Sequence, residues 1–433
     1  MVRCNHRLRG HAHHRQSASE SEARVRILLF THYYEPEIGA PQRRWRGLVR
    51  EFVEHGHEVA VCAPIAHYPH RRADALAVER PPVWRWTDGR QGETVLRVPY
   101  VPSSGTIPGQ LIDQSVSSLA SALAAVTMRG VRPDVLISTT PGLPMPFVAS
   151  AVASALRIPH IAEVRDAWPD LIADSSLVRR ALGGQLPAGA AQWLESSALP
   201  AVFHSALRSA DALVATTESF AAALRGRDMP PVTVVRNTSD VSAWPPRAAR
   251  RRVGTDLHIL YVGTVGRSQD LESVVRAVAD VTGVHLRIVG AGAQWEELRG
   301  LASTLTDRIE FFPQTTGAAL ESHWAWAHTG LVSLADVPSF ERTVPSKLVS
   351  VMARRVHVTG VVAGEAASMI RTSSGGSVSH PGDAGQLRRL LTALRDDPDS
   401  TLVDDRPLAW LRDHASPRAA AATYLNLLEE VRR

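Results

Sequence analysis

Residues 25–64 read VRILLFTHYYEPEIGAPQRRWRGLVREFVEHGHEVAVCAP, and their hydrophobic pattern changes twice. The first six residues, VRILLF, form a short apolar run that is typical of a strand buried on both faces of a parallel sheet. Apolar residues then recur at the spacing of a helix: Trp45, Leu48, Val49, Phe52 and Val53. Gly56 can end this helix, and HEVAVCAP after it predicts a second strand. Strand, helix and strand in this order predict a βαβ unit.

The same alternation continues beyond residue 64. Further apolar runs of strand length, mostly separated by helical patterns, are Thr94–Val98, Asp134–Ser138, His160–Val164, Ala212–Ala215 and Val232–Val235. From Asn237 to Arg252 the chain is rich in Pro and Arg and lacks apolar periodicity, which indicates a linker. We therefore predict a first Rossmann-like domain over 25–236 and a linker over 237–256.

A second α/β series begins at residue 257. Its predicted strands are LHILYVG, HLRIVG, RIEFF, TGLVSL and VHVTG, and helical patterns fall at 269–281, 293–305, 345–354 and 383–396. These patterns predict a second Rossmann-like domain over 257–413. Apolar residues at helical spacing in 417–431 predict a C-terminal helix, within 414–433, that is long enough to cross back to the first domain.

Two successive parallel sheets have a consequence for ligand binding. The loops at the carboxyl ends of parallel strands are where such sheets bind ligands, and two domains of this kind present these loops to each other. We therefore expect an α/β fold with a cleft between its two domains. The architecture by itself does not name a reaction.

The composition is that of an ordinary globular protein, with 44% hydrophobic and 21% charged residues. The two cysteines, Cys4 and Cys62, lie far apart and indicate neither a disulfide framework nor a cysteine metal site. A formal net charge of +5 permits an anionic partner, such as a nucleotide or a phospholipid surface. The sequence has neither an aromatic-basic platform nor zinc-finger spacing, so nucleic acid is not expected as a partner.

Residues 1–24 are polar and lack the apolar core of a signal peptide, and we expect them to form a disordered tail. Four histidines in this tail leave metal binding open as an alternative: His6, His11, His13 and His14. No apolar run reaches the roughly 18 residues needed to span a bilayer. We expect a cytoplasmic protein, with a peripheral contact at the inner face of a membrane left open.

Lysine is nearly absent from the chain. Of its 48 Lys and Arg residues, one is a lysine, Lys347. A codon bias toward arginine explains the arginines but not this exception, so Lys347 is a candidate functional residue, with chance retention as the alternative. It lies in SFERTVPSKL, residues 339–348, where Pro345 and Ser346 are typical of a helix start.

This position gives Lys347 a possible ligand. A cation in the first turn of a helix opposes the helix dipole, at a cost of roughly 0.3–1 kcal/mol. A bound diphosphate would turn this cost into a favourable contribution, because the helix N–H groups and the lysine would both face the diphosphate. Glu341, in the same stretch, can accept hydrogen bonds from sugar hydroxyls. The alternative is a solvated helix start.

Glycine-containing loops follow the first strand of each predicted domain. Gly39 would let the backbone approach a ligand before a helix begins, and the absence of GxGxxG argues against a dinucleotide. Gly263 and Gly266 permit close approach of a phosphate, and Arg267 adds positive charge. A plain turn is the alternative for each loop.

Asp166 follows the predicted strand His160–Val164, in the stretch EVRDAWP. A charged side chain at the carboxyl end of a parallel strand points toward the expected cleft. Asp166 can therefore orient a sugar hydroxyl or accept a proton from an acceptor. A structural pair with Arg165 is the alternative.

Six segments in this order form a wider pattern: EPEIGAPQRRW, EHGHEVAV, EVRDAWP, LYVGTVGRSQDL, FERTVPSKL, and GEAASMI with HPGD. Jointly they resemble retaining glycosyltransferases of the GT-B fold and of the family 4 type. Within that type they are most similar to fucosamine and related amino-sugar transferases of surface-polysaccharide synthesis. The resemblance covers residues 25–430.

The resemblance implies roles for individual residues. The second domain would hold a sugar nucleotide, with Lys347 at its diphosphate. Gly39, with Arg44 nearby, would face the donor and the acceptor. The nucleotide base would lie near Val289–Gly292 and Phe312–Gln314.

The sequence departs from the family pattern at two positions. A glutamate that binds the ribose is usual where this chain has Ser350, so a hydroxyl replaces a carboxylate there. An asparagine or arginine is frequent where this chain has Thr264. The first departure puts the strength of donor binding in doubt.

We therefore expect an enzyme that moves a sugar from a nucleotide-diphosphate donor to a hydroxyl of a glycan or lipid-linked acceptor, with retention. Lys347, helix N–H groups and Arg267 would stabilise the leaving diphosphate, and neither a metal nor a cofactor is expected. One alternative is a sugar-nucleotide epimerase or hydrolase, which would need carboxylates beyond Glu341 and Asp166. The other is a non-catalytic partner in polysaccharide assembly, which Ser350 favours.

Overall fold

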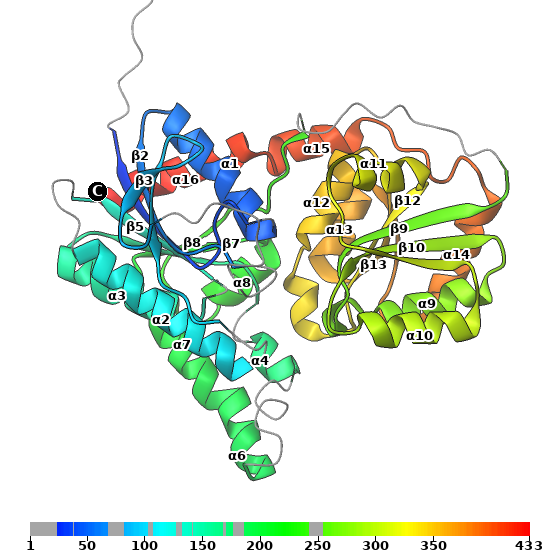
Figure 1. The fold of residues 1–433 in the computed structure, drawn as a ribbon, viewed down its shortest axis with the longest axis horizontal. Coiled ribbons are helices and arrows are strands. Elements are labelled where there is room, and N and C mark those ends of the chain that lie inside the picture. The colour runs from blue at the N-terminus through cyan, green and yellow to red at the C-terminus, as the bar shows by residue number, and fades with distance from the viewer. Residues whose placement is uncertain are drawn as a thin grey trace, which may run out of the picture.

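The computed structural model describes residues 24–37, 39–67, 82–102, 107–126, 132–140, 142–167, 170–175, 186–241 and 254–433. They form two α/β domains that lie side by side, each built on a largely parallel sheet (Figure 1). The predicted fold class is confirmed. The predicted tail, apart from Arg24, and residues 242–253 of the predicted linker lie outside the described residues.

The first domain contains an eight-stranded sheet in the order β3-β4-β2-β1-β5-β6-β7-β8. Its strands are β1 (Arg26–Thr31), β2 (Glu58–Pro64), β3 (Trp86–Asp88), β4 (Thr94–Val98), β5 (Val135–Thr139), β6 (His160–Val164), β7 (Ala212–Ala215) and β8 (Val232–Val234). All neighbours are parallel except β3 and β4.

Helices cover both faces of this sheet. They are α1 (Ala40–Glu54), α2 (Ile107–Val126), α3 (Met145–Leu156), α4 (Asp170–Ser175), α6 (Ala188–Trp193), η2 (Leu194–Ala198), α7 (Leu199–Arg208) and α8 (Glu218–Arg225). Alternate residues of the central strand β1 enter different cores, since successive strand side chains point to opposite faces. Leu29 packs in the same cluster as Trp45 of α1, whereas Phe30 packs with Met145 of α3.

The second domain contains a six-stranded parallel sheet in the order β11-β10-β9-β12-β13-β14. Its strands are β9 (Leu257–Thr264), β10 (Val284–Ala291), β11 (Ile309–Pro313), β12 (Thr329–Ser333), β13 (His357–Val361) and β14 (Gly376–Ser379). Its helices are η4 (Arg267–Gln269), α9 (Leu271–Asp280), α10 (Trp295–Leu305), α11 (Gly317–Trp326), η5 (Pro338–Arg342), α12 (Ser346–Ala353), α13 (Gly364–Thr372) and α14 (Ala384–Asp396).

Each predicted strand corresponds to an observed one, but β3 and β14 were not predicted. β3 has three residues at the edge of its sheet and none is buried, so it lacks an apolar run. β14 reads GSVS and contains a single large apolar residue. Both strands form because a neighbouring strand offers unpaired backbone groups, and a local sequence pattern does not carry that information.

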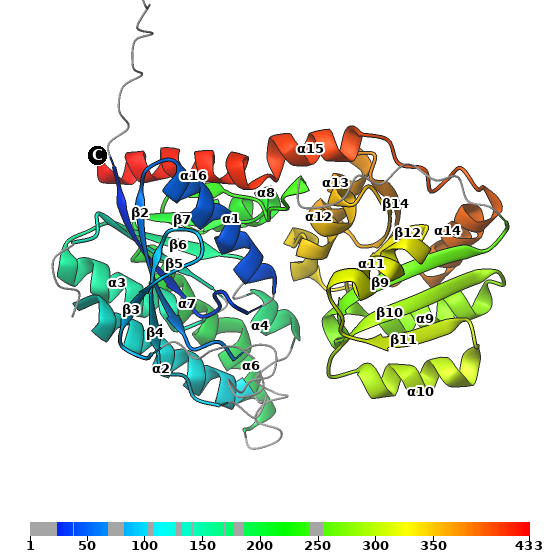
Figure 2. The same cartoon turned by 45° about the horizontal axis from the view of Figure 1, so that its top comes forward.

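The chain returns to the first domain at its end. After α15 (Arg406–His414), helix α16 (Pro417–Arg432) runs along the first domain beside α1 (Figure 2). Tyr424 of α16 is fully buried, and its ring lies 6.1 Å from that of Trp45 and 5.9 Å from that of Phe52. The predicted C-terminal crossover helix is therefore confirmed.

A buried ion pair joins α16, α1 and the sheet. Arg44 of α1 is 2% exposed, and its Nη2 lies 2.8 Å from Oε2 of Glu163, which is on β6 and fully buried. Glu163 also accepts hydrogen bonds from the hydroxyls of Thr139 and Tyr424. Burial alone would raise the pKa of Glu163, but Arg44 beside it holds that pKa below its ordinary value.

The substitution Glu163→Gln should destabilise the first domain by about 3–5 kcal/mol, because it leaves the guanidinium of Arg44 buried without a counter-charge. Urea denaturation followed by tryptophan fluorescence measures this loss. Glu58→Gln is the matched control, since its partner Arg24 is 67% exposed and such surface pairs contribute about 0–1 kcal/mol. Equal losses in the free energy of unfolding for the two variants would contradict the assignment of Arg44 and Glu163 as a buried, stabilising ion pair.

Candidate functional site

The topology of the second sheet marks one place for a ligand. The chain runs outward from β9 to β10 and β11, then crosses to β12 and runs outward in the other direction. A crevice at the carboxyl ends of the strands forms where the order reverses, here between β9 and β12. The loop of Gly263 and Gly266 follows β9, and the stretch that holds Glu341 and Lys347 follows β12.

The structure brings Lys347 to the loop after β9. Its Nζ donates to the hydroxyl of Tyr261 over 2.5 Å and lies 4.0 Å from the centre of the Tyr261 ring. A Cβ atom added to Gly263 would lie 3.4 Å from the same Nζ, so the ammonium borders the glycine backbone. Sequence reasoning missed Tyr261, because a tyrosine in a buried strand is typical of a hydrophobic core.

Lys347 has no carboxylate partner among the described residues. Burial lowers the pKa of its ammonium from 10.5 to about 7. A largely buried cation without a counter-charge is unfavourable, because the ring of Tyr261 replaces only part of the lost hydration. The site therefore favours an anion beside Lys347, in the first turn of α12.

Three glycines shape the loops beside Lys347 in different ways. Gly263 has a φ of +140°, which side chains rarely adopt. A Cβ atom on Gly290 would lie 1.9 Å from the carbonyl oxygen of Gly263, and one on Gly292 would lie 2.0 Å from that of Val265. The ends of β9 and β10, where Gly263 pairs with Gly290, and the loops directly after them thus touch through their backbones, and a side chain at Gly290 or Gly292 would separate them.

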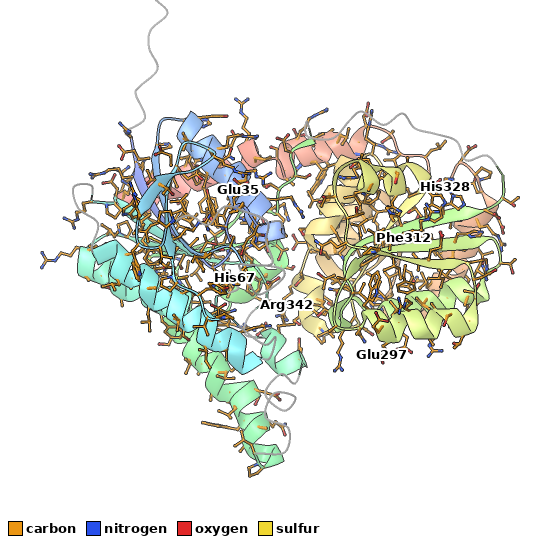
Figure 3. The ribbon with its side chains drawn as sticks, viewed as in Figure 1. Glu35, His67, Glu297, Phe312, His328 and Arg342 are labelled. Atoms are coloured by element: carbon orange, nitrogen blue, oxygen red, sulfur yellow. The ribbon has the colours of Figure 1, made fainter. Side chains whose placement is uncertain are left out.

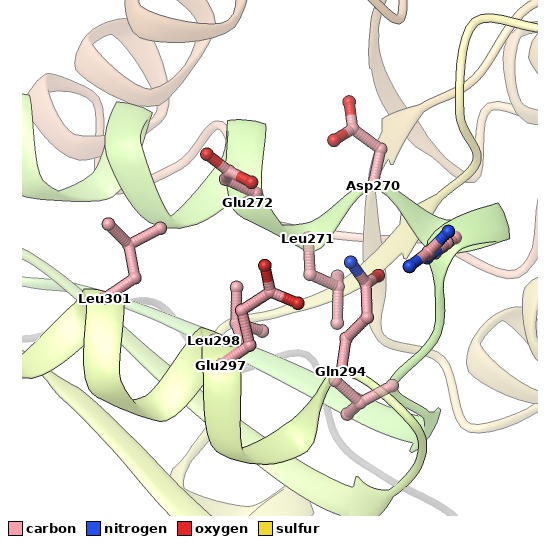
Figure 4. Close-up of a pocket in the computed structure, with 9 residues that line it drawn as sticks. Asp270, Leu271, Glu272, Gln294, Glu297, Leu298 and Leu301 are labelled. Atoms are coloured by element: carbon pink, nitrogen blue, oxygen red, sulfur yellow. The ribbon is translucent and has the colours of Figure 1, made fainter.

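Gly266 and Arg267 lie beyond this contact. The N–H of Gly266 already donates to Oε1 of Gln269 over 3.1 Å, so it is not free for a phosphate in this conformation. Arg267 is exposed and lines a small pocket between α9 and α10 (Figure 4). This pocket measures about 90 Å³ and includes the carboxylates of Glu272 and Glu297. Its size and charge suit neither a sugar nor a diphosphate.

Glu341 and Ser350 differ in their freedom to bind a ligand. Glu341 is exposed in η5, and no described residue donates a hydrogen bond to its carboxylate. Its backbone packs against Gly364, where a Cβ atom would lie 2.0 Å from the Glu341 carbonyl oxygen. The hydroxyl of Ser350 instead donates to the carbonyl of Ser346 over 3.2 Å, within the same helix.

Residues next to Glu341 hold the two domains together. Arg342 pairs with Asp170 of α4 at 2.5 Å, and its carbonyl accepts from the hydroxyl of Thr217 over 2.7 Å. Figure 3 shows Arg342 where the domains meet. The carboxylate of Glu365 accepts from both backbone N–H groups at the start of α8, those of Glu218 and Ser219. Sequence reasoning missed Glu365, whose signal was a carboxylate at the start of the GEAASMI stretch.

Asp166 lies at the edge of the first sheet that meets the second domain. It follows β6, and the neighbouring residues Thr140 and Thr216 both bond to the backbone of Arg165. Burial raises the pKa of Asp166, although the charge of Arg165 acts in the opposite direction. No described residue forms a hydrogen bond with the carboxylate of Asp166, and its pKa lies above the ordinary value of an aspartate.

Gly39 lies directly before a helix, as predicted, whereas the environment of Arg44 differs from the predicted one. Gly39 is the residue before α1, in an extended conformation with a φ of −170°. Arg44 points into the domain, where Glu163 and the carbonyls of Val235 and Arg236 occupy its guanidinium. The donor role expected for Arg44 therefore stays a prediction, and its contacts are those of a structural residue.

Metal-ligating side chains converge at one place in the part of the chain that the structure describes. His32, His67 and Asp113 are buried in the first domain, with their ligand atoms within 4.8 Å of one another. The sequence did not reveal this group, because its members are more than 30 residues apart and share no motif spacing.

Comparisons with known proteins identify both domains. Residues 39–238 match the family described as "Glycosyl transferase 4-like domain", and residues 256–397 match "Glycosyl transferases group 1". Two parallel-sheet domains, with a C-terminal helix that returns to the first, form the GT-B architecture. The chain is therefore a glycosyltransferase of the GT-B type.

Particular relatives agree with this class. WcaI of Escherichia coli (strain K12), a protein named as a colanic acid biosynthesis glycosyl transferase, is 25% identical over 339 residues, which are 76% of this chain and 81% of WcaI. Sucrose-phosphate synthase of Thermosynechococcus elongatus has a TM-score of 0.68 at 16% identity, over 94% of this chain and 99% of that structure. HepE of Anabaena, solved with UDP-glucose, has a TM-score of 0.64 at 14% identity, over 94% of this chain and 100% of its own.

Gly290→Ala should destabilise the second domain by about 3 kcal/mol or more, because the added methyl group overlaps the carbonyl oxygen of Gly263. Differential scanning calorimetry measures this loss. Gly300→Ala is the control, since a Cβ atom there meets nothing within 4 Å in helix α10 and should stabilise by about 0.5–1 kcal/mol. An unchanged transition for Gly290→Ala would show that the two loops do not need their close contact.

Proposed function

We propose that the chain transfers a sugar with retention, from a nucleotide-diphosphate donor to a hydroxyl of a glycan or lipid-linked acceptor, in polysaccharide synthesis. The observation that carries this proposal is the ammonium of Lys347, largely buried and without a carboxylate partner among the described residues. When the bond between the anomeric carbon and the diphosphate breaks, negative charge grows on the leaving oxygen. The interactions of this oxygen with Lys347 and with the N–H groups at the start of α12 are then strongest in the transition state.

The acceptor side needs a group that takes a proton. For retention in a single step, the acceptor oxygen must bond to the anomeric carbon on the face from which the diphosphate leaves, and the hydroxyl proton leaves toward a base. We assign this base to Asp166, because no described residue bonds to its carboxylate and its raised pKa makes it a better proton acceptor than an exposed aspartate. Glu341, exposed and free in η5, would bind hydroxyls of the donor sugar. In the proposed step, residues of the chain stabilise the negative charge on the leaving diphosphate, and no metal takes part.

The relatives support a choice of substrates for testing. HepE was solved with UDP-glucose, and WcaI is named for colanic acid biosynthesis. The sequence resemblance to family 4 amino-sugar transferases adds UDP-linked amino sugars to the donors to be tested. We therefore propose a uridine nucleotide as the donor carrier and a cell-surface glycan precursor as the acceptor.

A lipid-linked acceptor requires access to a membrane surface, and α2 offers an apolar face for it. Five of its described large apolar residues are exposed, Leu111 among them. The other four recur at intervals of four, three and four, which places them on one side of the helix: Ile112, Val116, Leu119 and Leu123. Their exposed fractions range from 36% to 63%. No helix of the described residues is both long and apolar enough to cross a bilayer. We propose that this face of α2 lies on the membrane.

A non-catalytic role is the second candidate function. The hydroxyl of Ser350 is bonded within its own helix and stands where related enzymes have a ribose-binding glutamate. A chain that binds a sugar nucleotide tightly but forms no product with any acceptor fraction would have this role. Product formation, detected by mass spectrometry of the glycan fraction, would exclude it.

Lys347→Met should weaken the binding of a UDP-sugar by about tenfold to 150-fold, which corresponds to a charge-assisted contact of about 1.5–3 kcal/mol. Isothermal titration calorimetry on a panel of UDP-, GDP- and dTDP-sugars measures this change. Arg371→Met, an exposed charge removed from α13, should leave the affinity unchanged.

The affinity of the wild type should also depend on pH. Lys347 must carry its proton to bind the diphosphate, and its pKa is about 7. The dissociation constant should therefore stay level below pH 7 and rise about tenfold per unit well above it, whereas Lys347→Met shows no such rise. Equal affinity of the two proteins at pH 6.5 would refute the proposed diphosphate contact.

Leu119→Ser combined with Ile112→Ser should reduce binding to vesicles that contain anionic lipid by about tenfold, because two exposed apolar side chains leave the α2 face. Vesicle co-sedimentation measures this, and catalytic activity on a water-soluble acceptor should be retained. Leu305→Ser, at an apolar residue of the second domain that is 42% exposed, is the control. Unreduced binding by the double variant would rule out this face.

A further inference from the structure

Three buried side chains of the first domain meet at the carboxyl edge of its sheet. His32 follows β1, His67 follows β2, and Asp113 comes from α2. They are 3%, 5% and 4% exposed. The Nε2 atom of His32 lies 3.3 Å from Oδ2 of Asp113, and the Nε2 atom of His67 lies 3.4 Å from the same oxygen. Figure 3 shows the position of His67 in the first domain.

The hydrogen bond of Nδ1 determines which nitrogen of the His67 ring carries the proton. Nδ1 lies 2.7 Å from the carbonyl oxygen of Ile65, and a carbonyl oxygen only accepts hydrogen bonds. Nδ1 therefore carries the hydrogen. In the neutral ring Nε2 then has a lone pair, and this lone pair faces the carboxylate of Asp113. The ring of Tyr100, stacked at 4.8 Å, holds the imidazole in this orientation.

The ring of His32 has the same arrangement. Its Nδ1 lies 3.0 Å from Oγ of Ser117. When the hydroxyl hydrogen of Ser117 donates to the carbonyl of Gln114, 3.2 Å away, Ser117 accepts from His32. Nδ1 of His32 is then the protonated nitrogen, and its Nε2 lone pair also faces Asp113.

Two lone pairs directed at one anionic oxygen repel each other and the carboxylate. Protonation of one ring leaves the lone pair of the other against the carboxylate. Protonation of both rings places two imidazolium ions side by side in a buried site, where the carboxylate of Glu37, 3.7 Å from Nδ1 of His67, is the second nearby anion. Separations of 3.3 and 3.4 Å are also longer than the roughly 2.7–2.9 Å of hydrogen bonds between ionised groups. A cation between the three ligand atoms resolves both difficulties.

The separations of the two histidine nitrogens from the Asp113 oxygen, 3.3 and 3.4 Å, fit those between neighbouring ligands of a tetrahedral ion. Zinc bonds of about 2.0–2.2 Å to nitrogen and oxygen place neighbouring ligands about 3.3–3.5 Å apart. Histidine ligands of metals almost always donate their second ring N–H to a carbonyl, a carboxylate or a water, as His67 does to Ile65. The remaining oxygen of Asp113 is likewise held, by the N–H of Val101 at 2.9 Å.

We propose that His32, His67 and Asp113 form a binding site for a divalent transition-metal ion of the zinc type. The ion fastens α2 to the ends of β1 and β2, and a water or a substrate oxygen completes its coordination. The site belongs to the first domain, so it does not rest on the role of Lys347. The leaving diphosphate in the second domain needs no ligand from this ion.

The test uses the full-length chain with the four tail histidines replaced by glutamine, because His6, His11, His13 and His14 could bind metal themselves. This parent protein is stripped with chelator, incubated with Zn²⁺, dialysed and assayed for bound zinc. One equivalent should remain bound, and Co²⁺ in its place should give the visible bands of a tetrahedral site. Asp113→Asn and His67→Gln should each lose that equivalent, whereas the exposed His414→Gln should keep it.

Thermal melting separates loss of metal from loss of folding. Zn²⁺ should raise the melting temperature of the parent protein by several degrees and leave that of Asp113→Asn unchanged. If the variants do not fold, the Co²⁺ spectrum of the parent alone decides. A parent protein that retains no zinc after dialysis and gives no tetrahedral Co²⁺ bands would overturn the proposal, and the cluster would then be a hydrogen-bonded His–Asp–His group.

Discussion

The first domain depends on the ion pair between Arg44 and Glu163. Both groups are almost fully buried, and an isolated charge in such a place costs several kcal/mol. The pair is stable because further contacts satisfy it, from the hydroxyls of Thr139 and Tyr424 and from the carbonyls of Val235 and Arg236. Helix α1, the centre of the sheet, the end of the domain and helix α16 must therefore all be in place together.

Lys347 presents the opposite electrostatic situation in the second domain. Arg44 has a carboxylate and two carbonyls, whereas Lys347 has a tyrosine hydroxyl and an aromatic face. Burial lowers the pKa of Lys347 to about 7, while the contacts of Arg44 raise its own pKa despite burial. The contrast distinguishes a charge that the fold itself neutralises from one that has no carboxylate partner among the described residues, although both are basic residues in the first half of a helix.

Much of the fold followed from the sequence, because apolar runs and helical spacing report burial directly. Lys347 was also found from the sequence, through its uniqueness and its place at a helix start. The role of Arg44 was not predicted, because its partners lie 119 to 192 residues away, in the carboxylate of Glu163 and in the backbone carbonyls of Val235 and Arg236. His32 and His67 were missed for the same reason: parallel strands bring their ends together, and no sequence spacing records which loops meet.

Helix α16 also determines the order in which this protein can be completed during synthesis. The ribosome makes α1, β6 and their ion pair early, but it makes α16 only after every strand of the second domain. Until α16 emerges, the faces of Trp45 and Phe52 that Tyr424 covers are open to water, and Glu163 lacks one of its donors. The second domain can thus complete its sheet before α16 covers Trp45 and Phe52. The first domain, although it is synthesised first, is therefore the last to complete its hydrophobic core.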